Sequence, residues 1–374
     1  MSDADKSLLM KDGLGVHAIK RIANSVALVV PGFNAKAFQK DAVRGLDELE
    51  LKARVHHLIE VLHRHYDLPF KKLSKHLQKL PEVWDKGNAT DNKAGFAAWP
   101  VIDYVAVHGL QHPEEALQTL EKLTLLFSAE FAIRPFIQQH VDITYSTLLQ
   151  WCEHPSEHVR RLASEGSRPR LPWGMRLSQF IDNPEPLVGI LEKLKADESM
   201  YVRRSVANNL NDISKDNPEW MINLCERWLA DSHEHTDWIV KHALRSLVKA
   251  GDERVFPLLG YAAKPNVTVS DIALNKKRIA VGDSIGLSCR ITGGKKPQNL
   301  VVDYVIYFMK ANGKLAPKVF KLKNIVLAEQ ETIVITKQHS FKPITTRRYY
   351  AGQHQLAIQV NGKEVARTDF FLHG

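Results

Sequence analysis

Cysteine is scarce in this sequence. Cys152, Cys225 and Cys289 are the only three in 374 residues, and they lie far apart. No Cys-x-x-Cys pair is present, which argues against a structural zinc site and against a disulfide framework. This cysteine usage is typical of a protein from a reducing compartment.

Long hydrophobic runs are also missing. The longest apolar stretches, such as 26–30 and 123–127, are far shorter than the ~20 residues that span a bilayer. The N-terminal segment MSDADKSLLMK has acids and lysines where a signal peptide would need an apolar run. We expect a cytoplasmic protein without a membrane segment, and the length predicts two or three domains.

The histidines do not form a recognisable metal motif. Four of them, His56, His57, His63 and His65, lie in one predicted helix. Apolar residues define the other face of this helix at helical spacing: Leu51, Val55, Leu58, Ile59 and Leu62. No cysteine or carboxylate stands at a fixed ligand spacing from the histidines, so we interpret them as part of a polar helix face and expect no metal.

Positive charge is concentrated in the last 110 residues. Residues 265–374 hold 17 Lys and Arg against 7 Asp and Glu, a net of +10, whereas residues 1–264 hold 34 against 35. A basic module joined to a near-neutral body favours binding to a polyanion. Simple solubility is the alternative explanation for the excess.

Helical periodicity dominates the first 264 residues. Pro31–Gly32 and Leu68–Pro69 mark turns between helices. The segment PEEALQTLEKLTLLFSAEFAIRPFI, residues 113–137, is predicted to be one helix that carries Glu130 deep among apolar residues. Arg134 is the i+4 neighbour of Glu130, so a surface ion pair would explain both residues, although the surrounding aromatics favour partial burial.

Three later segments repeat one another. EHPSEHVRRLASEG, DESMYVRRSVANNL and HTDWIVKHALRSL align on Val159, Val202 and Val240, with spacings of 43 and 38 residues. A period of roughly 40 residues with two helices per unit is the signature of HEAT-type solenoids. Such units stack into a curved array because none of them can bury its apolar face alone.

Residues 159–174, in the first of these repeats, contain several charged side chains and an aromatic one that could form a site. Arg160, Arg161, Arg168 and Arg170 surround one acid, Glu165, and the stretch ends on the turn-forming pair Pro172–Trp173. The next repeat supplies Asn208 at the place equivalent to Glu165, followed by Asp212. Two acids from adjacent repeats, directed at one groove lined with arginines, are not required for stacking.

From residue 265 the pattern changes to a period of two. The segments 266–274, 280–291, 299–309, 318–327, 331–341 and 354–360 read as short strands with glycine-containing turns. Six or more strands at this spacing predict a β-sandwich of immunoglobulin type. We therefore predict a mainly α protein: a HEAT-like helical repeat solenoid, residues 1–264, followed by a basic, DNA-binding immunoglobulin-like β-sandwich, residues 265–374.

The strings LLFSAEFAIRPFI, RRLASEGSRPRLPW and VRRSVANNLNDISKDNP resemble the AlkC branch of the AlkC/AlkD family of DNA alkylation-repair glycosylases. The resemblance covers the whole chain and implies a monofunctional enzyme that hydrolyses the N-glycosidic bond of cationic bases, such as N3-methyladenine and N3-methylcytosine, in duplex DNA. It also implies that the enzyme works without a deep base-flipping pocket. Because a cationic base is already a good leaving group, we expect no cofactor, and we expect a monomer.

The same resemblance assigns roles to residues. Glu130, Glu165 and Asp212 would surround the scissile sugar, and Trp173 would lie against the lesion or its sugar. The remaining predicted DNA contacts are Arg134, Arg160, Arg161, Arg168, Arg170, Arg203, Arg204, Asn208, Lys276, Lys277, Arg347 and Arg348. The alternative function is a non-catalytic HEAT-repeat scaffold that binds nucleic acid or protein. In that case Glu165 and Asp212 would each face an arginine of the neighbouring repeat and be shielded from the groove.

Overall fold

The computed structural model describes residues 9–87, 91 and 94–374. The chain forms two compact units: Met1–Met221 with Ser232–His242, and Ile222–Asp231 with Ala243–Gly374. The helices, four of them short 3-10 helices (η), are η1 (Met10–Leu14), α1 (Val16–Val29), α2 (Ala35–Val43), η2 (Leu46–Glu48), α3 (Leu51–His65), α4 (Phe70–Leu77), α5 (Leu80–Val83), η3 (Phe96–Ala98), α6 (Trp99–His108), α7 (Pro113–Leu123), α8 (Arg134–Gln139), α9 (Val141–Trp151), α10 (Glu157–Gly166), α11 (Ser178–Asp182), η4 (Glu185–Leu187), α12 (Val188–Leu194), α13 (Met200–Ile213), α14 (Pro218–Ala230), α15 (Glu234–Ala243), α16 (Arg245–Ala250) and α17 (Val255–Leu258).

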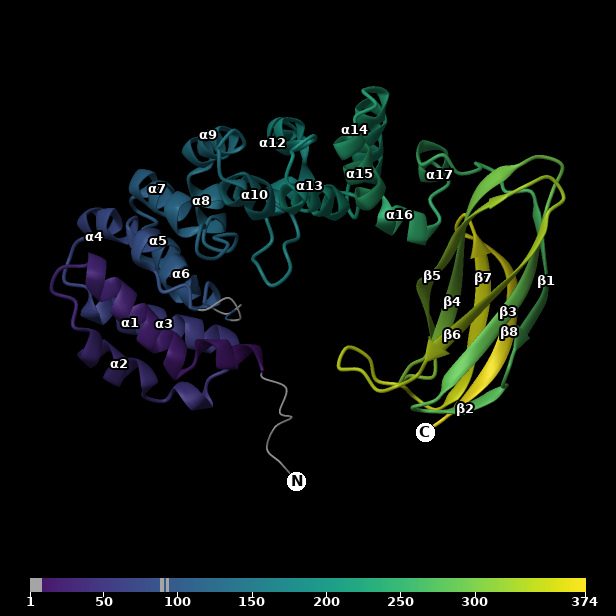
Figure 1. Ribbon diagram of the computed structural model, residues 1–374, viewed down its shortest axis with the longest axis horizontal. Coiled ribbons are helices and arrows are strands. Elements are labelled where there is room, and N and C mark those ends of the chain that lie inside the picture. Colours follow the sequence, from purple (N-terminus) through teal and green to yellow (C-terminus); the bar gives the residue numbers. More distant parts are fainter. Residues whose placement is uncertain (1–8, 88–90, 92–93) are drawn as a thin grey trace. The chain divides into compact units, whose positions relative to one another are not determined.

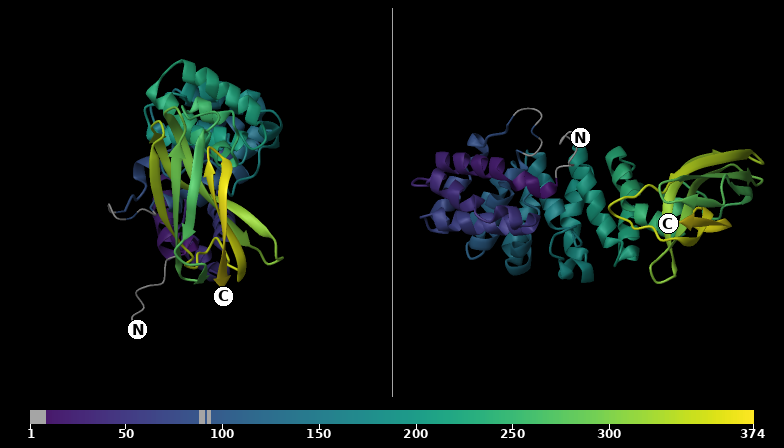
Figure 2. Two further views of the ribbon diagram at one scale, coloured as in Figure 1. Left: turned by 90° about the vertical axis from the view of Figure 1, so that its right-hand side faces the viewer. Right: turned by 90° about the horizontal axis from the view of Figure 1, so that it is seen from below.

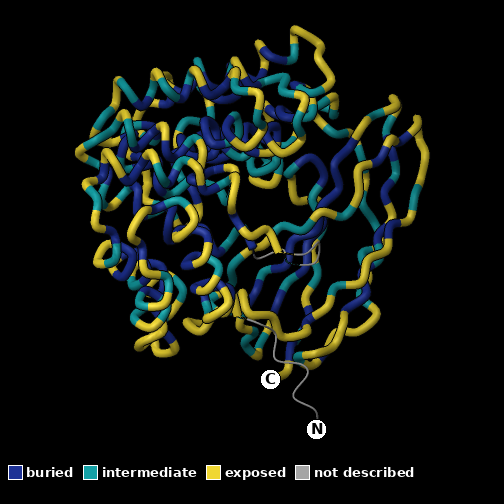
Figure 3. Tube along the Cα trace, turned by 60° about the vertical axis from the view of Figure 1, so that its left-hand side comes forward, coloured by how far each residue is buried: buried dark blue, intermediate teal, exposed yellow. Residues whose placement is uncertain are grey.

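Helices of the first unit stack in two layers. Helices α4, α7, α9 and α12 follow one another in one layer, while α10 and α13 pack side by side in the other (Figure 1). Stretches of buried residues lie inside the helical part of the chain, and exposed residues lie mostly on its outside (Figure 3). The aligned valines, Val159 and Val202, are completely buried, as the repeat pattern requires. The predicted HEAT-like array is confirmed, and no described helix is long and apolar enough to cross a membrane.

The predicted helix over residues 113–137 is wrong in its middle part. Helix α7 ends at Leu123 and α8 begins at Arg134, with turns between them. Pro135, in the first turn of α8, has no N–H with which to continue an earlier helix. In the gap, the Ala129 N–H donates to the Thr124 hydroxyl, 3.3 Å away. Glu130 therefore lies on a turn segment and not within a helix.

The second unit contains a β-sandwich. Its strands are β1 (Val267–Leu274), β2 (Arg278–Ala280), β3 (Ser284–Gly293), β4 (Gln298–Met309), β5 (Leu315–Leu327), β6 (Thr332–Ser340), β7 (Gly352–Val360) and β8 (Lys363–His373). One sheet has the order β1-β3-β6 and the other β2-β8-β7-β4-β5, and the two lie face to face (Figure 2). All pairings are antiparallel except that of β2 with β8.

Alternation along the strands builds the core of the sandwich. Ile285, Leu287, Cys289 and Ile291 of β3 face the same core as every second residue of β4 from Leu300 to Phe308. The six predicted strands are present, and β2 and β8 are additional. The second unit also includes α16 and α17, so it begins earlier in the chain than the strands do.

Candidate active site

Glu165 and Asp212 come from adjacent repeats and meet through one arginine. Glu165 lies near the end of α10 and Asp212 near the end of α13, and they are 5% and 1% exposed. The Arg168 guanidinium donates to both, from Nη1 to Glu165 Oε1 at 2.7 Å and from Nε to Asp212 Oδ2 at 2.8 Å. The other oxygen of Glu165 accepts from the Ser205 hydroxyl at 2.6 Å, and that of Asp212 from Lys215 Nζ at 2.8 Å.

Glu130 joins the same group through a second arginine. Its Oε2 accepts from the Ser128 hydroxyl at 2.7 Å and from Arg161 Nη1 at 3.1 Å. The second Nη of Arg161 lies 3.5 Å from Glu165 Oε1. The surface pair of Glu130 with Arg134, which was the alternative explanation, is absent among the described contacts, because Glu130 is not on a helix and pairs with Arg161. The expected partial burial of Glu130 is confirmed, since its side chain is 18% exposed.

These contacts form one chain of alternating charges, Glu130–Arg161–Glu165–Arg168–Asp212, which we call the carboxylate network. The structure thus brings together the three acids that the sequence singled out, from three separate segments. A cavity of about 350 Å³ beside the network is lined by Glu130, Arg161, Tyr201 and His158. Tyr201 places its ring 4.5 Å from the Arg161 guanidinium carbon.

Arg134 is completely buried, so its predicted contact with DNA is not available in this structure. Its Nη1 donates to the carbonyl of Gly166 at 2.7 Å and its Nε to the carbonyl of Met175 at 2.8 Å. Burial and the nearby Arg168 lower the pKa of the Arg134 guanidinium to about 10. Gly166 also permits the close approach of Ile133, because a Cβ at residue 166 would lie 2.5 Å from a methyl group of Ile133.

Arg134 therefore holds both ends of the loop of residues 167–177, which we call the tryptophan loop and which is teal in Figure 1. Trp173 lies on this loop with a φ of 65° and is 61% exposed. The left-handed conformation is strained for a bulky residue. A bond from Lys52 Nζ to the Trp173 carbonyl, at 2.7 Å, holds the residue in place. Strained backbone at an exposed aromatic residue is more common at functional sites than elsewhere.

The first arginine of each Val-Arg-Arg motif is bonded to the protein itself. Arg160 donates to the carbonyls of His154 and Pro155, and Arg203 donates in the same way to those of Asp197 and Glu198. Arg160 also makes a two-bond ion pair with Asp197. These guanidinium groups fix the turn before each helix, so in this structure they are not free for phosphates.

The other predicted contacts of the helical unit differ in accessibility. Arg170 makes a two-bond pair with Asp216, both bonds at 2.6 Å. Arg204 is exposed, and Asn208 is half-buried one turn before Asp212. Of the two arginines, Arg204 has the more accessible positive charge, because Arg170 is paired with Asp216.

The basic residues of the sandwich lie on loops. Lys276 and Lys277 are exposed between β1 and β2, and Arg348 is exposed between β6 and β7. The neighbouring Arg347 is half-buried, with its guanidinium carbon 4.3 Å from the centre of the Phe308 ring. Three of the four predicted sandwich contacts are therefore accessible cations, and Arg347 packs against aromatics.

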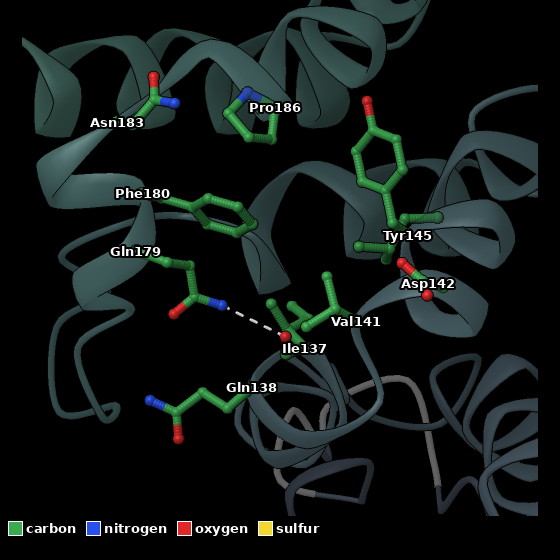
Figure 4. Close-up of a pocket in the computed structure, with 10 residues that line it drawn as sticks. Ile137, Gln138, Val141, Asp142, Tyr145, Gln179, Phe180, Asn183 and Pro186 are labelled. Atoms are coloured by element: carbon green, nitrogen blue, oxygen red, sulfur yellow. Dashed lines mark hydrogen bonds between the residues drawn. The ribbon is translucent and has the colours of Figure 1, made fainter.

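A larger cavity, of about 650 Å³, lies away from the carboxylate network between α8, α9 and α11. Its walls are mostly apolar, and Figure 4 shows Val141, Phe180 and Pro186 around it. The Gln179 side chain donates to the carbonyl of Ile137 at 3.2 Å and closes one side. No member of the carboxylate network lines this cavity.

The sequence prediction did not include Asp103, an acid that lies near the tryptophan loop. Asp103 on α6 lines a small cavity together with Trp99, Phe131 and Trp173. In the sequence it appears only as the acid of WPVIDY, four residues after a tryptophan at the start of an apolar helix. That spacing places the two side chains on one helix face and was the available signal.

The fold and site define a HEAT-like repeat protein with a carboxylate–arginine network between repeats and a C-terminal immunoglobulin-like sandwich. Residues 268–374 match the family model described as the C-terminal Ig-like domain of the uncharacterised protein YhaZ. YhaZ of Bacillus subtilis (strain 168) is 39% identical over 363 residues, which covers 96% of this chain and 98% of YhaZ.

A solved structure is similar over the full length. It is the alkylpurine DNA glycosylase AlkC of Pseudomonas fluorescens, bound to DNA containing an abasic site analog. The TM-score is 0.91 at 39% identity, covering 98% of this chain and 100% of the AlkC chain. The chain therefore belongs to the AlkC branch of the AlkC/AlkD family of HEAT-like-repeat DNA alkylation-repair glycosylases.

Proposed function

We propose that this protein is a monofunctional DNA glycosylase. It hydrolyses the N-glycosidic bond of cationic alkylated bases, such as N3-methyladenine and N3-methylcytosine, in duplex DNA. The observation that carries the proposal is the full-length similarity, in sequence and fold, to an alkylpurine DNA glycosylase whose structure contains DNA. The three linked carboxylates give the proposal its chemistry.

A base that carries a positive charge is already a good leaving group, so the reaction needs little help from a general acid. The remaining tasks are to stabilise the oxocarbenium-like sugar and to place a water molecule, and carboxylates do both in glycoside chemistry. Glu130 is the acid of the network that lines an accessible cavity, and it would face the sugar. Glu165 and Asp212, each bonded to Arg168, would supply negative potential behind it.

The groups around the network would bind the rest of the substrate. The exposed face of Trp173 attracts a cationic ring through its π-electrons, which favours charged lesions over ordinary bases. Arg204 and the exposed sandwich residues Lys276, Lys277 and Arg348 would contact phosphates and position the duplex without reading its sequence.

One observation favours the scaffold function instead. Asp212 is buried and faces Arg168 of the neighbouring repeat, as expected of an inter-repeat ladder. Glu165 also bonds Ser205 across the repeat boundary. In a pure scaffold these pairs would contribute stability alone.

The test is the release of free methylated base from a methylated duplex. Glu130→Gln, Glu165→Gln and Asp212→Asn are compared with wild type, because the amides keep the shape and remove the charge. Asp197→Asn is the matched control, since Asp197 is a similarly buried acid paired with an arginine of the neighbouring repeat but lies outside the network. Losing a buried pair lowers the thermal midpoint in every variant of such a pair.

Activity then separates the two functions. For a glycosylase we expect the network amides to lose at least about 100-fold in base release, as removal of one transition-state-stabilising group does. Asp197→Asn should lose stability and keep its activity below its melting point. If wild type binds DNA and releases no base, the scaffold function is correct.

A further inference from the structure

Tyr201 covers one face of an arginine of the carboxylate network. It is the second residue of α13, and its ring centre lies 4.5 Å from the guanidinium carbon of Arg161 on α10. A cation over the face of an aromatic ring, within about 6 Å of its centre, is attracted by the π-electrons of the ring. The side chain of Arg161 is only 16% exposed. Because the contact is shielded from water, it is stronger than the same contact on an open surface.

The acids of the network bind the edges of the same guanidinium. A guanidinium donates in its own plane, so a ring on its face leaves the N–H groups free to bond. Arg161 Nη1 donates to the Ser128 hydroxyl at 2.9 Å and to Glu130 Oε2 at 3.1 Å. Its other Nη lies 3.5 Å from Glu165 Oε1. The ring and the acids thus hold the guanidinium from different directions, and a swing of Arg161 towards solvent would break both kinds of contact.

DNA offers Arg161 a competing partner. Burial lowers the pKa of the Arg161 guanidinium, but Glu165 and Glu130 together raise it by more, so the pKa lies above its usual value. Arg161 therefore stays a cation under all conditions in which DNA binds. A phosphate of an approaching duplex would compete with the carboxylates for this group. A ring that holds the guanidinium in place favours its pairing with the acids.

The ring of Tyr201, and not its hydroxyl, makes these contacts. Burial raises the pKa of the phenol, although Arg161 acts in the opposite direction, so the hydroxyl stays protonated at neutral pH and is not a base. The ring of His158 meets the Tyr201 ring edge to face, with centres 5.7 Å apart and planes at 74°. Both residues line the cavity that Glu130 lines. A tyrosine is not required by the repeat, since the residues before the other aligned valines are His158 and Ile239.

We propose that Tyr201 is a positioning residue of the glycosylase reaction. Its ring keeps the Arg161 guanidinium bonded to Glu130 and Glu165, so that Glu130 presents its carboxylate to the sugar in one orientation. This inference rests on the proposed glycosylase function and adds to it a residue of the next repeat that acts through an arginine.

The effect of Tyr201 should fall on the chemical step. Glu130 lies on a turn, and its Oε2 is held by Ser128 and Arg161. Catalytic groups have to be held within about 0.5 Å of their productive position. A carboxylate that stabilises a developing positive sugar acts in the transition state and contributes little to binding of the intact substrate. Loss of the ring should therefore slow base release and leave the affinity for the duplex nearly unchanged.

The experiment measures base release from a methylated duplex with the enzyme in excess, so that a single turnover is followed. Duplex affinity and thermal midpoint are measured on the same proteins. Tyr201→Leu removes the ring and keeps an apolar side chain, whereas Tyr201→Phe keeps the ring and removes the hydroxyl. Tyr307→Leu is the matched control, because Arg367 lies over the Tyr307 ring at the same 4.5 Å and also bonds an acid, Glu364.

We expect Tyr201→Leu to release base about three- to thirty-fold more slowly than wild type, which is the range expected for loss of one cation–π contact. Its affinity for the duplex should stay close to that of wild type. Tyr201→Phe should release base at close to the wild-type rate, because the ring remains. Tyr307→Leu should also keep the wild-type rate, since it breaks a similar pair outside the network.

A double variant tests whether Tyr201 acts through Arg161. Arg161→Gln removes the cation, so adding Tyr201→Leu to this variant should slow base release little further. If the two losses multiply instead, Tyr201 contacts the duplex on its own and the inference is overturned.

Two other results would overturn the inference. One is a wild-type rate in Tyr201→Leu when wild type releases base, which leaves the glycosylase function standing. The other is a loss in Tyr201→Phe as large as that in Tyr201→Leu, which would assign the effect to the hydroxyl. Absence of base release by wild type would contradict the glycosylase function itself, and this role of Tyr201 would fall with it.

Discussion

Asp103 shows how a single residue lowers the stability of the fold. Its carboxyl is packed among aromatic rings and has one hydrogen bond, from Trp99. Natural cores seldom keep such an acid, because replacing it with a neutral side chain is easy. Asp103 and the strained Trp173 line the same cavity, and each of the two features lowers the stability of the folded state.

This reasoning predicts a pH dependence. Burial raises the pKa of Asp103 from 3.8 to about 7, so the folded state resists ionisation of this group. Asp103 therefore lowers stability progressively as pH rises from about 4 to about 7, and the loss stays constant above that range. Asp103→Asn should melt several degrees above wild type at about pH 8 and much closer to wild type at about pH 4.

Thermal melts of both proteins across this pH range would check the prediction. The difference between the two isolates Asp103 from every other titrating group. Equal midpoints for both proteins at high and low pH would show that the Asp103 carboxyl is solvated in solution.

At the scale of elements, the tryptophan loop depends on one buried arginine. Arg134 bonds the carbonyls of Gly166, which directly precedes the loop, and of Met175, which lies near its other end. A lysine in its place cannot donate in two fixed directions from a planar group. We therefore expect Arg134→Lys to release the loop locally as well as to lower the overall stability.

Trypsin provides the measurement, because Arg170 and Arg176 lie within the loop. Cleavage after these residues should become at least several-fold faster in Arg134→Lys under native conditions, since local opening exposes the backbone. Arg203→Lys is the control, because Arg203 also bonds two carbonyls but holds a different turn. Equal acceleration in both variants would mean that global unfolding, and not the loop, controls cleavage.

Most helices of the repeats and six of the strands could be predicted from the sequence. Helical periodicity located α3 and the repeat helices, and two-residue alternation located six strands, because burial of one face determines the pattern. The break between α7 and α8 was missed, since a helical pattern continues across residues 124–133 and the Thr124 hydroxyl bond is specific to this fold. Motifs identified the three acids, but not the pairing of Arg168 with two of them, which depends on how adjacent repeats pack.

Across the whole molecule, the two units divide the charges between them. In the helical unit most of the predicted arginine contacts are occupied by protein carboxylates or carbonyls, as in Arg160, Arg168 and Arg170. In the sandwich, Lys276, Lys277 and Arg348 remain exposed. Long-range attraction to DNA should therefore come mainly from the sandwich, and specificity for the lesion from the helical unit.

This division predicts the salt dependence of DNA binding. Removing one cation that binds a phosphate lowers the slope of log K against log salt by about 0.9. The triple variant Lys276→Gln, Lys277→Gln, Arg348→Gln should therefore have a slope lower by about 2–3. The control Lys314→Gln, Lys321→Gln, Lys323→Gln removes the same charge from exposed positions on and beside β5. Binding titrations at several salt concentrations measure both slopes. If the two variants change the slope equally, the sandwich acts through its net charge, and the loops between β1 and β2 and between β6 and β7 make no contacts of their own.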